Sequence, residues 1–252
     1  MLPRLAWLVM LTGCGLMMWS DSAEAQKDKK DERTQEQKDK DFLNEQMNRL
    51  ARAYELVAEG RDKNAPEYLI TAAGMMQQVA GVQALNKPPK LDIQPEITEG
   101  NKDAVVEDKS PLTLLDQSAE LFKEASDMGA AQGVNVDPLI KLARSRKPNE
   151  TRSVVGGPKK VCATIGPGAT AKYTYTLRTN DYSQWFFNSK ATLTVAVRRA
   201  DNNQPFYWGK TTYASRVWHP NWHPNPKVKQ APITIMVQNY SKKKVHFEFM
   251  LQ

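Results

Sequence analysis

The chain has 252 residues, of which 40% are hydrophobic, which suits one or two modest domains rather than one large enzyme core. The 35 Lys and Arg residues outnumber the 28 Asp and Glu residues, giving a net charge of +7. That balance permits an acidic partner, but no dense basic run with interleaved aromatic residues is present, so nucleic acid is not favoured. The two cysteines, Cys14 and Cys162, are too few for a disulfide framework.

Residues 1–25 have the three parts of a secretory signal peptide. A basic start is followed by an apolar stretch from Leu5 to Trp19 and by the cleavage site Ala23-Glu24-Ala25. The apolar stretch falls short of the ~20 residues that a membrane-spanning helix needs, and no other stretch is apolar enough. The sequence therefore predicts an exported protein, periplasmic or extracellular, with no membrane span once the signal is removed.

A second interpretation of the leader is a lipid anchor. Leu11-Thr12-Gly13-Cys14 resembles a bacterial lipobox, in which Cys14 would be lipidated and become the first residue. A lipobox cysteine is normally followed by a polar linker, whereas apolar residues follow here from Leu16 to Trp19. Cleavage after Ala25 is therefore favoured over lipidation at Cys14.

Residues 26–148 predict a charged lead-in and then a helical region. The lead-in, residues 26–41, has no apolar face, so it is either disordered or a solvated extension of the next helix. In residues 42–148 apolar side chains recur every three or four positions, which predicts about four helices around a surface loop at 86–110. The predicted helices run from Phe42 to Gly60, from Asn64 to Asn86, from Ser110 to Gly129, and onward from Asp137. Asn64 and Ser110 are the predicted N-caps of the second and third helices.

Residues 149–160 are a predicted linker, and residues 161–252 predict an antiparallel β-sandwich domain. Polar and apolar residues alternate along several short segments separated by turn residues such as Asp201-Asn202-Asn203. The clearest strands are Ala171–Arg178, Ala191–Arg199, Ile233–Val237 and Val245–Leu251, with another beginning at Phe206. The predicted fold class is α+β, with an all-α region before a sandwich.

Two motifs in the sandwich suggest a family. Ile165-Gly166-Pro167-Gly168 precedes Tyr173, and a late strand, Ile235–Asn239, precedes a closing strand. This arrangement resembles the bacterial pre-peptidase C-terminal domain. The resemblance covers the last third of the chain and implies a small jelly-roll-like sandwich that acts as an accessory, binding or structural module. The Asp-rich strand that such domains often carry is absent, and Thr194–Arg199 stands in its place, so no calcium site is implied.

A tandem repeat lies within the same domain: Trp218-His219-Pro220-Asn221, then Trp222-His223-Pro224-Asn225. The prolines exclude a helix, so His219 and His223 cannot form the i, i+4 pair of a helical metal site, and no metal is predicted. One interpretation is a rigid loop that displays Trp218 and Trp222 to a ligand such as a sugar or peptide, with His219 and His223 as further candidate ligand-binding residues. The other, more common for aromatic residues, is that both tryptophans fold back and cap the sandwich.

The remaining candidate residues, Cys162 and His246, do not form a recognisable catalytic or metal-binding pattern. Cys162 lies in an apolar run, Val161–Ile165, and is predicted to be a buried small hydrophobe, with a reactive thiol as the alternative. His246 alternates with apolar neighbours and is expected on the solvent face. A nucleophile elbow, a P-loop, a dinucleotide fingerprint and an H-E-x-x-H motif are all absent from the sequence, so neither an enzyme nor a cofactor is predicted.

Three hypotheses follow from these patterns. The first is an exported, non-enzymatic protein whose β-sandwich binds an envelope polysaccharide or an exported protein. The second is a structural or assembly factor that binds partners through its helices, for which an uncovered apolar patch would be the evidence. The third, a hydrolase or metal enzyme, requires a carboxylate within hydrogen-bond reach of His219 or His223.

Overall fold

The computed structural model describes residues 33–146 and 157–252. The chain forms two compact units, Met1–Lys38 and Asp39–Gln252. The predicted signal peptide, with both of its alternatives at Cys14 and Ala25, and most of the predicted linker lie outside the described residues. In the first unit, helix α1 (Gln35–Asp62) begins with a reciprocal cap, because the amide of Gln37 donates to Thr34 Oγ1 and the amide of Thr34 donates to Gln37 Oε1.

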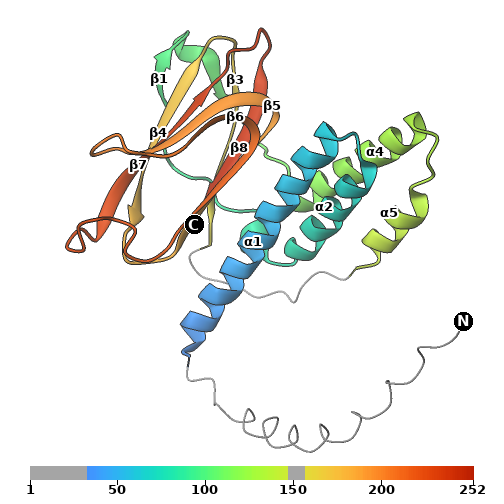
Figure 1. Ribbon diagram of the computed structural model, residues 1–252, viewed down its shortest axis with the longest axis horizontal. Helices are drawn as coiled ribbons and strands as arrows, with labels where there is room; N and C mark the ends of the chain where they lie inside the picture. The colour runs from blue at the N-terminus through green and yellow to red at the C-terminus, as the bar shows by residue number, and fades with distance from the viewer. Residues whose placement is uncertain (1–32, 147–156) are drawn as a thin grey trace, which may run out of the picture. The chain divides into compact units, whose positions relative to one another are not determined.

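The second unit continues α1 and adds α2 (Pro66–Val79), the short α3 (Gln83–Asn86), α4 (Leu114–Ala131) and α5 (Asp137–Arg144) (Figure 1). The apolar residues spaced by three and four positions meet in one helical core, as the sequence pattern indicates. The hydroxyl of Ser118 on α4 donates to the carbonyl of Ala73 on α2, at 2.9 Å. The core includes Leu43, Met47, Leu50, Tyr54, Val57, Leu69, Ala72, Ala73, Met76, Leu121, Phe122 and Ala125.

Two helix starts differ from those expected from sequence. Thr113, rather than Ser110, caps α4, because Thr113 and Asp116 stand three residues apart and form a capping box. Asn64 does not cap α2 but turns the chain, with a left-handed φ of 52°. Pro66 is the first residue of that helix, where its missing N–H costs nothing. Among the described helices, none combines the length and apolar character needed to cross a membrane.

The strands form one antiparallel sheet in the order β1-β4-β7-β5-β8-β3-β2, with β6 paired to β5. The long strand β5 belongs to both layers of a sandwich, since its first residues pair with β8 and its last residues pair with β7. The antiparallel β-sandwich and the mixed character of the fold are thus confirmed. The strands are β1 (Glu96–Glu99), β2 (Val105–Glu107), β3 (Lys159–Ile165), β4 (Thr170–Arg178), β5 (Ser183–Arg199), β6 (Pro205–Trp218), β7 (Gln230–Gln238) and β8 (Val245–Leu251).

The inward faces of the two layers supply a second core. Because side chains alternate across a strand, every second residue of the predicted segments points inward. Tyr173 packs edge-on against Phe249, with ring centroids 5.1 Å apart, and Phe187 stacks on Phe247 at 6.0 Å. The core includes Val161, Ala163, Ile165, Tyr173, Leu177, Trp185, Phe187, Val195, Val197, Ile233, Ile235, Val237, Phe247 and Phe249.

The segment predicted as a surface loop, residues 86–110, contributes two strands to the sandwich, so that prediction was incomplete. Strand β1 pairs with β4, and β2 pairs with β3, which closes both ends of the sheet order. These strands have only four and three residues, too few to show an alternating pattern in the sequence. They form because the sandwich offers unpaired edges to which the chain returns. The strand β3 likewise begins at Lys159, within the predicted linker.

The helices pack on one outer face of the sandwich, formed by β8, β3 and the first half of β5 (Figure 1). Phe186 and Met250, on the outward side of these strands, belong to the helical core. The Tyr54 ring lies 5.2 Å from that of Phe186, centroid to centroid, and Gln252 Nε2 donates to Asn44 Oδ1 at 2.9 Å. The outer face of the other layer carries exposed side chains, including Glu96, Thr174 and Trp208.

Candidate functional site

The tandem repeat lies at one end of the sandwich, at the end of β6 and in the loop that leads to β7. Trp218 is 2% exposed, and its ring meets those of Phe206 and Trp222 at centroid distances of 5.5 and 6.3 Å. The half-buried Trp222 also contacts Phe206, and its indole N–H donates to the carbonyl of Arg178 at 3.1 Å. Trp218 is therefore a core residue that caps the sandwich, and only Trp222 keeps part of its ring in solvent.

The two histidines of the repeat have different surroundings. His219 is exposed, and its ring lies edge-on to Tyr182 with centroids 5.9 Å apart. His223 is 7% exposed and takes part in a polar network with Arg199 and Asp201. The structure therefore does not display the four candidate residues as one surface: Trp218 and His223 are inside, whereas His219 and part of Trp222 are outside. Ligand binding by His219 and Trp222 stays a prediction.

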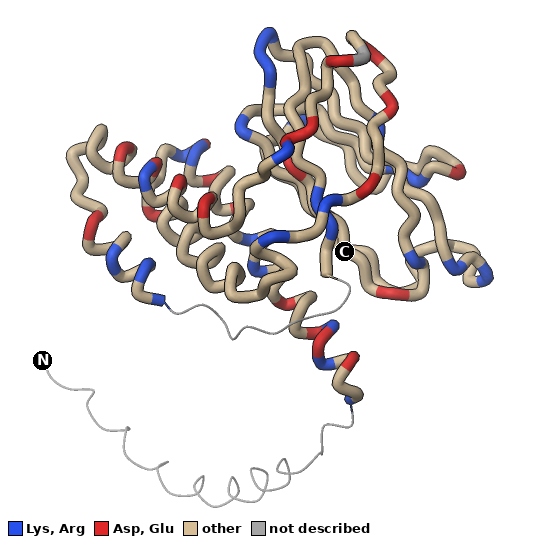
Figure 2. The backbone as a smooth tube through the Cα atoms, turned by 180° about the vertical axis from the view of Figure 1, so that it is seen from behind, with Lys and Arg blue, Asp and Glu red and all other residues tan. Residues whose placement is uncertain are grey.

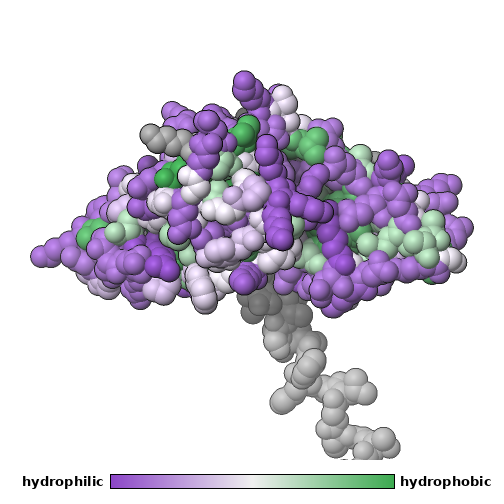
Figure 3. Space-filling view, turned by 90° about the horizontal axis from the view of Figure 1, so that it is seen from above, coloured by the Kyte–Doolittle hydropathy of each residue, from purple (hydrophilic) through white to green (hydrophobic). Residues whose placement is uncertain are grey.

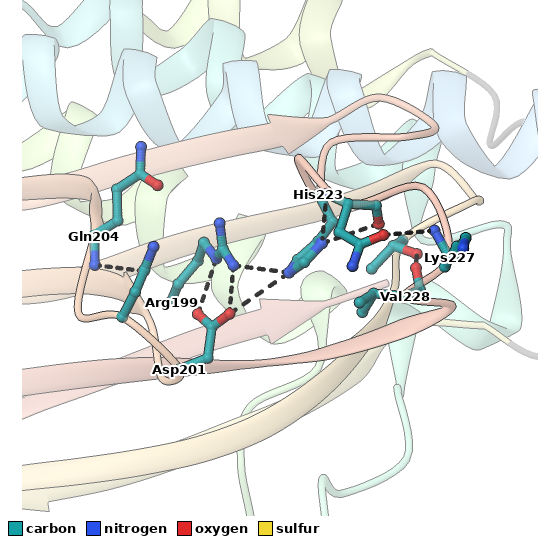
Figure 4. A network of polar contacts seen from close by, with 9 residues as sticks. Arg199, Asp201, Gln204, His223, Lys227 and Val228 are labelled. Carbon is teal, nitrogen blue, oxygen red and sulfur yellow. Dashed lines mark hydrogen bonds and ion pairs between the residues drawn. The ribbon is translucent and has the colours of Figure 1, made fainter.

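Figure 4 shows the network around His223. The Arg199 guanidinium donates from Nε to Asp201 Oδ1 at 2.9 Å and from Nη2 to Asp201 Oδ2, and Nη2 lies 2.7 Å from His223 Nε2. Because arginine can only donate, Nε2 of His223 is the acceptor in this contact. Its Nδ1 lies 3.2 Å from both the amide nitrogen and the carbonyl oxygen of Asn225. The network fixes the loop on the end of β5.

The same network bears on the hydrolase hypothesis. Asp201 Oδ2 is 3.5 Å from His223 Nε2, so a carboxylate does approach one imidazole. However, Arg199 holds both groups, and its hydrogen bond, with its charge, lowers the pKa of Asp201. The imidazole nitrogen that a catalytic base would use is therefore already occupied. Within residues 33–146 and 157–252, no group of three or more His, Cys, Asp or Glu side chains is placed to hold a metal ion.

An exposed tryptophan that the sequence did not single out lies on the open face of the sandwich. A β-bulge in β6, where Tyr207 pairs with Val197 but Pro205 pairs with Arg198, leaves Phe206 unpaired. Tyr207 points inward to Trp185, at a centroid distance of 6.1 Å. Trp208 therefore points outward, and its side chain is 70% exposed. Because side chains alternate along a strand, an inward Tyr207 would have predicted from sequence that Trp208 points outward.

The strand register shows what lies beside Trp208. Trp208 pairs with Ala196, Ala196 with Met236, Met236 with Lys172, and Lys172 with Glu96, so these five side chains share one row across the sheet. The row begins with an indole and ends with an ion pair of 3.1 Å between Lys172 Nζ and Glu96 Oε2. In the next row, Gln238 Nε2 donates to Glu99 Oε2 at 2.7 Å. The face thus offers one flat aromatic ring and several polar groups within the same plane.

The other outer face holds a buried ion pair that sequence patterning also missed. Lys160 on β3 and Glu248 on β8 are in direct contact, and each side chain is 7% exposed. Burial, the largest single cause, raises the pKa of Glu248, but the charge and hydrogen bond of Lys160 together with the hydrogen bond of Tyr54 leave the net pKa lowered. Burial likewise lowers the pKa of Lys160, yet the Glu248 carboxylate leaves it raised overall. Alternation within β8 predicts an outward Glu248, but only the helices decide that this outward face is covered.

Cys162, on the same outward face, is a free cysteine and is buried, as the apolar run around it predicts. Burial raises the pKa of its thiol to about 12, which makes it a poor nucleophile. His246 is half-buried rather than on an open solvent face, because the helical region lies over its strand, and burial lowers its pKa. These two residues, with Glu248, line a cavity between the helices and the sandwich.

No protein-family model matches the chain, and no curated protein sequence matches it. The solved structure of TmCBM61 in complex with β-1,4-galactotriose is similar over 68% of this chain and 91% of that chain, with a TM-score of 0.33 and 9% identity. A mutant family 29 carbohydrate-binding module is similar over 40% and 68%, with a TM-score of 0.24 and 9% identity. The enzymatically active domain of a bacteriophage CBA120 tailspike protein is similar over 71% and 21%, with a TM-score of 0.26 and 12% identity.

The chain therefore bears a weak structural similarity to β-sandwich carbohydrate-binding modules, which is a statement about fold. These scores are too low to assign a family or to transfer a ligand. The resemblance to the pre-peptidase C-terminal domain stays a prediction, since no family model matches.

Proposed function

We propose that this is an exported, non-enzymatic protein whose β-sandwich binds a polysaccharide of the cell envelope on its open sheet face. The observation that carries the proposal is Trp208, a large aromatic ring that is 70% exposed on a regular strand. An exposed tryptophan costs free energy in water, and an aromatic ring can stack on the apolar face of a sugar while keeping its N–H available. Tryptophan is also among the residues that dominate binding energy at interfaces.

Lys210, two positions along β6, is the charged side chain beside Trp208 on this face, and the groups farther along the row of Trp208 suit a neutral, hydroxyl-rich ligand. Lys172 and Glu96 neutralise each other, and the Gln238 amide lies in the adjacent row. Charged residues of both signs occur among the helices and the strands (Figure 2). Strands β3, β4, β5 and β6 carry only Lys and Arg, two or three on each strand. A nucleic acid or other polyanion needs a concentrated positive surface. Sugar hydroxyls need only donors and acceptors beside a flat ring, which this face provides.

The test is co-sedimentation of the full mature chain with insoluble envelope polysaccharides, comparing wild type with Trp208→Ala. Loss of a binding hot spot worth about 2 kcal/mol weakens binding roughly 30-fold. Tyr240→Ala is the matched control, because Tyr240 is a similarly exposed aromatic, 66% exposed, in the loop between β7 and β8. Equal binding by wild type and Trp208→Ala contradicts the proposal, whereas loss in Trp208→Ala alone supports it.

Export is a separate part of the proposal and has its own test. The leader anatomy predicts that the protein recovered from outside the cytoplasm begins at Gln26. N-terminal sequencing or mass spectrometry of that fraction decides between this start and a lipid-modified Cys14. Recovery of the intact chain from the cytoplasm contradicts export.

A second candidate function, an assembly factor that binds partners through its helices, is favoured by apolar side chains around α5. Val134, Leu139 and Leu142 are 50%, 48% and 61% exposed. On the face shown in Figure 3, hydrophobic residues otherwise form small separate patches among hydrophilic ones. If this function holds, Leu139→Ser with Leu142→Ser abolishes partner binding and Trp208→Ala leaves it unchanged.

A further inference from the structure

The cavity between the helices and the sandwich has a floor of strand residues and a roof of helix residues. On the floor, Asn188, Glu248 and Cys162 lie in one row, since Asn188 pairs with Glu248 and Glu248 pairs with Cys162. Helices α1, α2 and α4 supply Tyr54, Val57, Met76, Gln117 and Leu121 to the same cavity. Its volume is about 210 Å³, below the ~300–1,000 Å³ of pockets for drug-sized ligands. The space suits a molecule of about one six-membered ring.

The two carboxylate oxygens of Glu248 differ in their hydrogen-bond partners. Oε2 contacts the Lys160 ammonium, accepts from Gln117 Nε2 at 3.3 Å and lies 3.7 Å from Cys162 Sγ. Oε1 has no hydrogen-bond partner within the described residues, although the side chain is 5% exposed. The Tyr54 hydroxyl also lies beside Glu248 and helps to lower the pKa of that carboxyl, but its hydrogen is shared with Gln117 Oε1, at 2.8 Å. A buried carboxylate oxygen without a donor is costly, and a donor from a ligand removes that cost.

Two more polar side chains of the lining are free to bind. Within the part of the chain that the structure describes, neither the Asn188 amide nor the His246 ring makes a hydrogen bond, and both residues line the cavity. The amide can donate and accept, and a neutral imidazole can do either. Val57, Met76 and Leu121 line the cavity from the helices, so polar and apolar groups face one another across it.

The charges around the cavity favour a neutral ligand over an ion. Lys160 already neutralises Glu248. The other charged residues of the lining are two of each sign, Arg61 and Lys190 against Asp108 and Glu120, so the lining has no excess charge for a bound cation or anion to neutralise. A neutral molecule needs no such excess. A hydroxyl group supplies the donor that Glu248 Oε1 lacks, and a second hydroxyl suits Asn188 or His246. The apolar face of the same ring suits the helix side of the cavity.

We propose that this cavity binds a single neutral sugar ring or a polyol of that size, with one hydroxyl donating to Glu248 Oε1 and with Asn188 and His246 bonding its other hydroxyls. This site is distinct from the open sheet face around Trp208, because it lies on the outer face of the other layer. It does not depend on polysaccharide binding at Trp208. The ligand is a small molecule rather than a polymer, because the helices cover the strand residues and leave no room for a long chain.

The test is a titration of the full mature chain with a panel of monosaccharides and alditols, followed by ligand-observed NMR and calorimetry. Glucose, galactose, mannose, N-acetylglucosamine and ribitol are used up to about 50 mM, well above the ~1 mM Kd at which so small a ligand is readily detected. Asn188→Leu keeps the side-chain size, fills the site with an apolar group and leaves Glu248 with its Lys160 partner. Trp208→Ala is the control that removes only the sheet-face ring.

Saturable binding of one panel member that weakens at least tenfold in Asn188→Leu and is unchanged in Trp208→Ala supports the cavity. Three results overturn it: no binding by any member of the panel, binding that Asn188→Leu leaves intact, or binding that Trp208→Ala removes. The last result assigns the sugar to the open face instead. Circular dichroism and thermal melting confirm that both variants are folded, which separates a lost site from a lost fold.

Discussion

Replacing Lys160 by methionine isolates the energy of the buried ion pair. The substitution keeps most of the side-chain volume but leaves Glu248 buried beside uncharged groups, namely the Gln117 amide, the Cys162 thiol and the Tyr54 hydroxyl. Removing one member of a buried pair costs about 3–5 kcal/mol, because the remaining charge is desolvated without compensation. For a chain of this size, that corresponds to a fall in Tm of roughly 6–20 °C. Differential scanning calorimetry and urea denaturation measure the change.

Two further variants test whether the charge, rather than the contact, is responsible. The double variant Lys160→Met with Glu248→Leu removes both charges, and we expect it to regain most or all of the lost stability. Lys90→Met is the matched surface control: Lys90 Nζ lies 2.7 Å from Glu107, but the two side chains are 56% and 40% exposed. Its expected cost is about 0–1 kcal/mol. A loss in Lys160→Met no larger than that in Lys90→Met refutes the reasoning.

The pH dependence gives an independent check on the same pair. The pKa of Glu248 is lowered below its ordinary value of 4.5, so the stability it contributes is present above pH 4.5 and is lost as pH falls through the folded-state pKa. The pKa of Lys160 is raised above 10.5, so its contribution is present below pH 10.5 and is lost as pH rises through the folded-state pKa. In Lys160→Met, burial without the ammonium raises the pKa of the carboxyl, so the difference in stability from wild type narrows toward acid pH.

Four smaller predictions concern other parts of the chain. Because burial raises the pKa of Cys162 to about 12, about one thiol in ten thousand is ionised at pH 8; we expect alkylation by iodoacetamide only after unfolding, as read by mass spectrometry. Trp208→Phe should remove most of the acrylamide quenching of tryptophan fluorescence in the folded mature protein, whereas Trp218→Phe should not, since these side chains are 70% and 2% exposed. Arg199→Met should release the loop that precedes β7 and cost about 1–3 kcal/mol, which urea denaturation and limited proteolysis of that loop would detect. Gly129→Ala should destabilise α4 by about 1–3 kcal/mol in thermal melts, despite the better helix propensity of alanine, because its Cβ would lie 2.9 Å from a carbonyl oxygen of the turn that follows the helix.

Local periodicity in the sequence was enough to give the mixed fold and the inward faces of the main strands. In β8, the alternating apolar residues Val245, Phe247, Phe249 and Leu251 point inward as that pattern requires. The spacing of apolar residues between Phe42 and Val57 likewise places one face of α1 in the helical core. Such patterns succeed because neighbouring residues share one backbone geometry, so they need no information from the rest of the chain.

Tertiary structure alone decided which outward faces are covered. The alternation of side chains assigns both Glu248 and Trp208 to outward positions. The helices cover Glu248, whereas Trp208 stays exposed to solvent. The pairing of β1 and β2 with the sandwich and the burial of Trp218 also depend on segments far away in the chain. A sequence specifies on which side of a strand a residue lies, whereas burial depends on what packs there, and that packing is a long-range property. Both proposed binding sites, one open and one enclosed, follow from that difference.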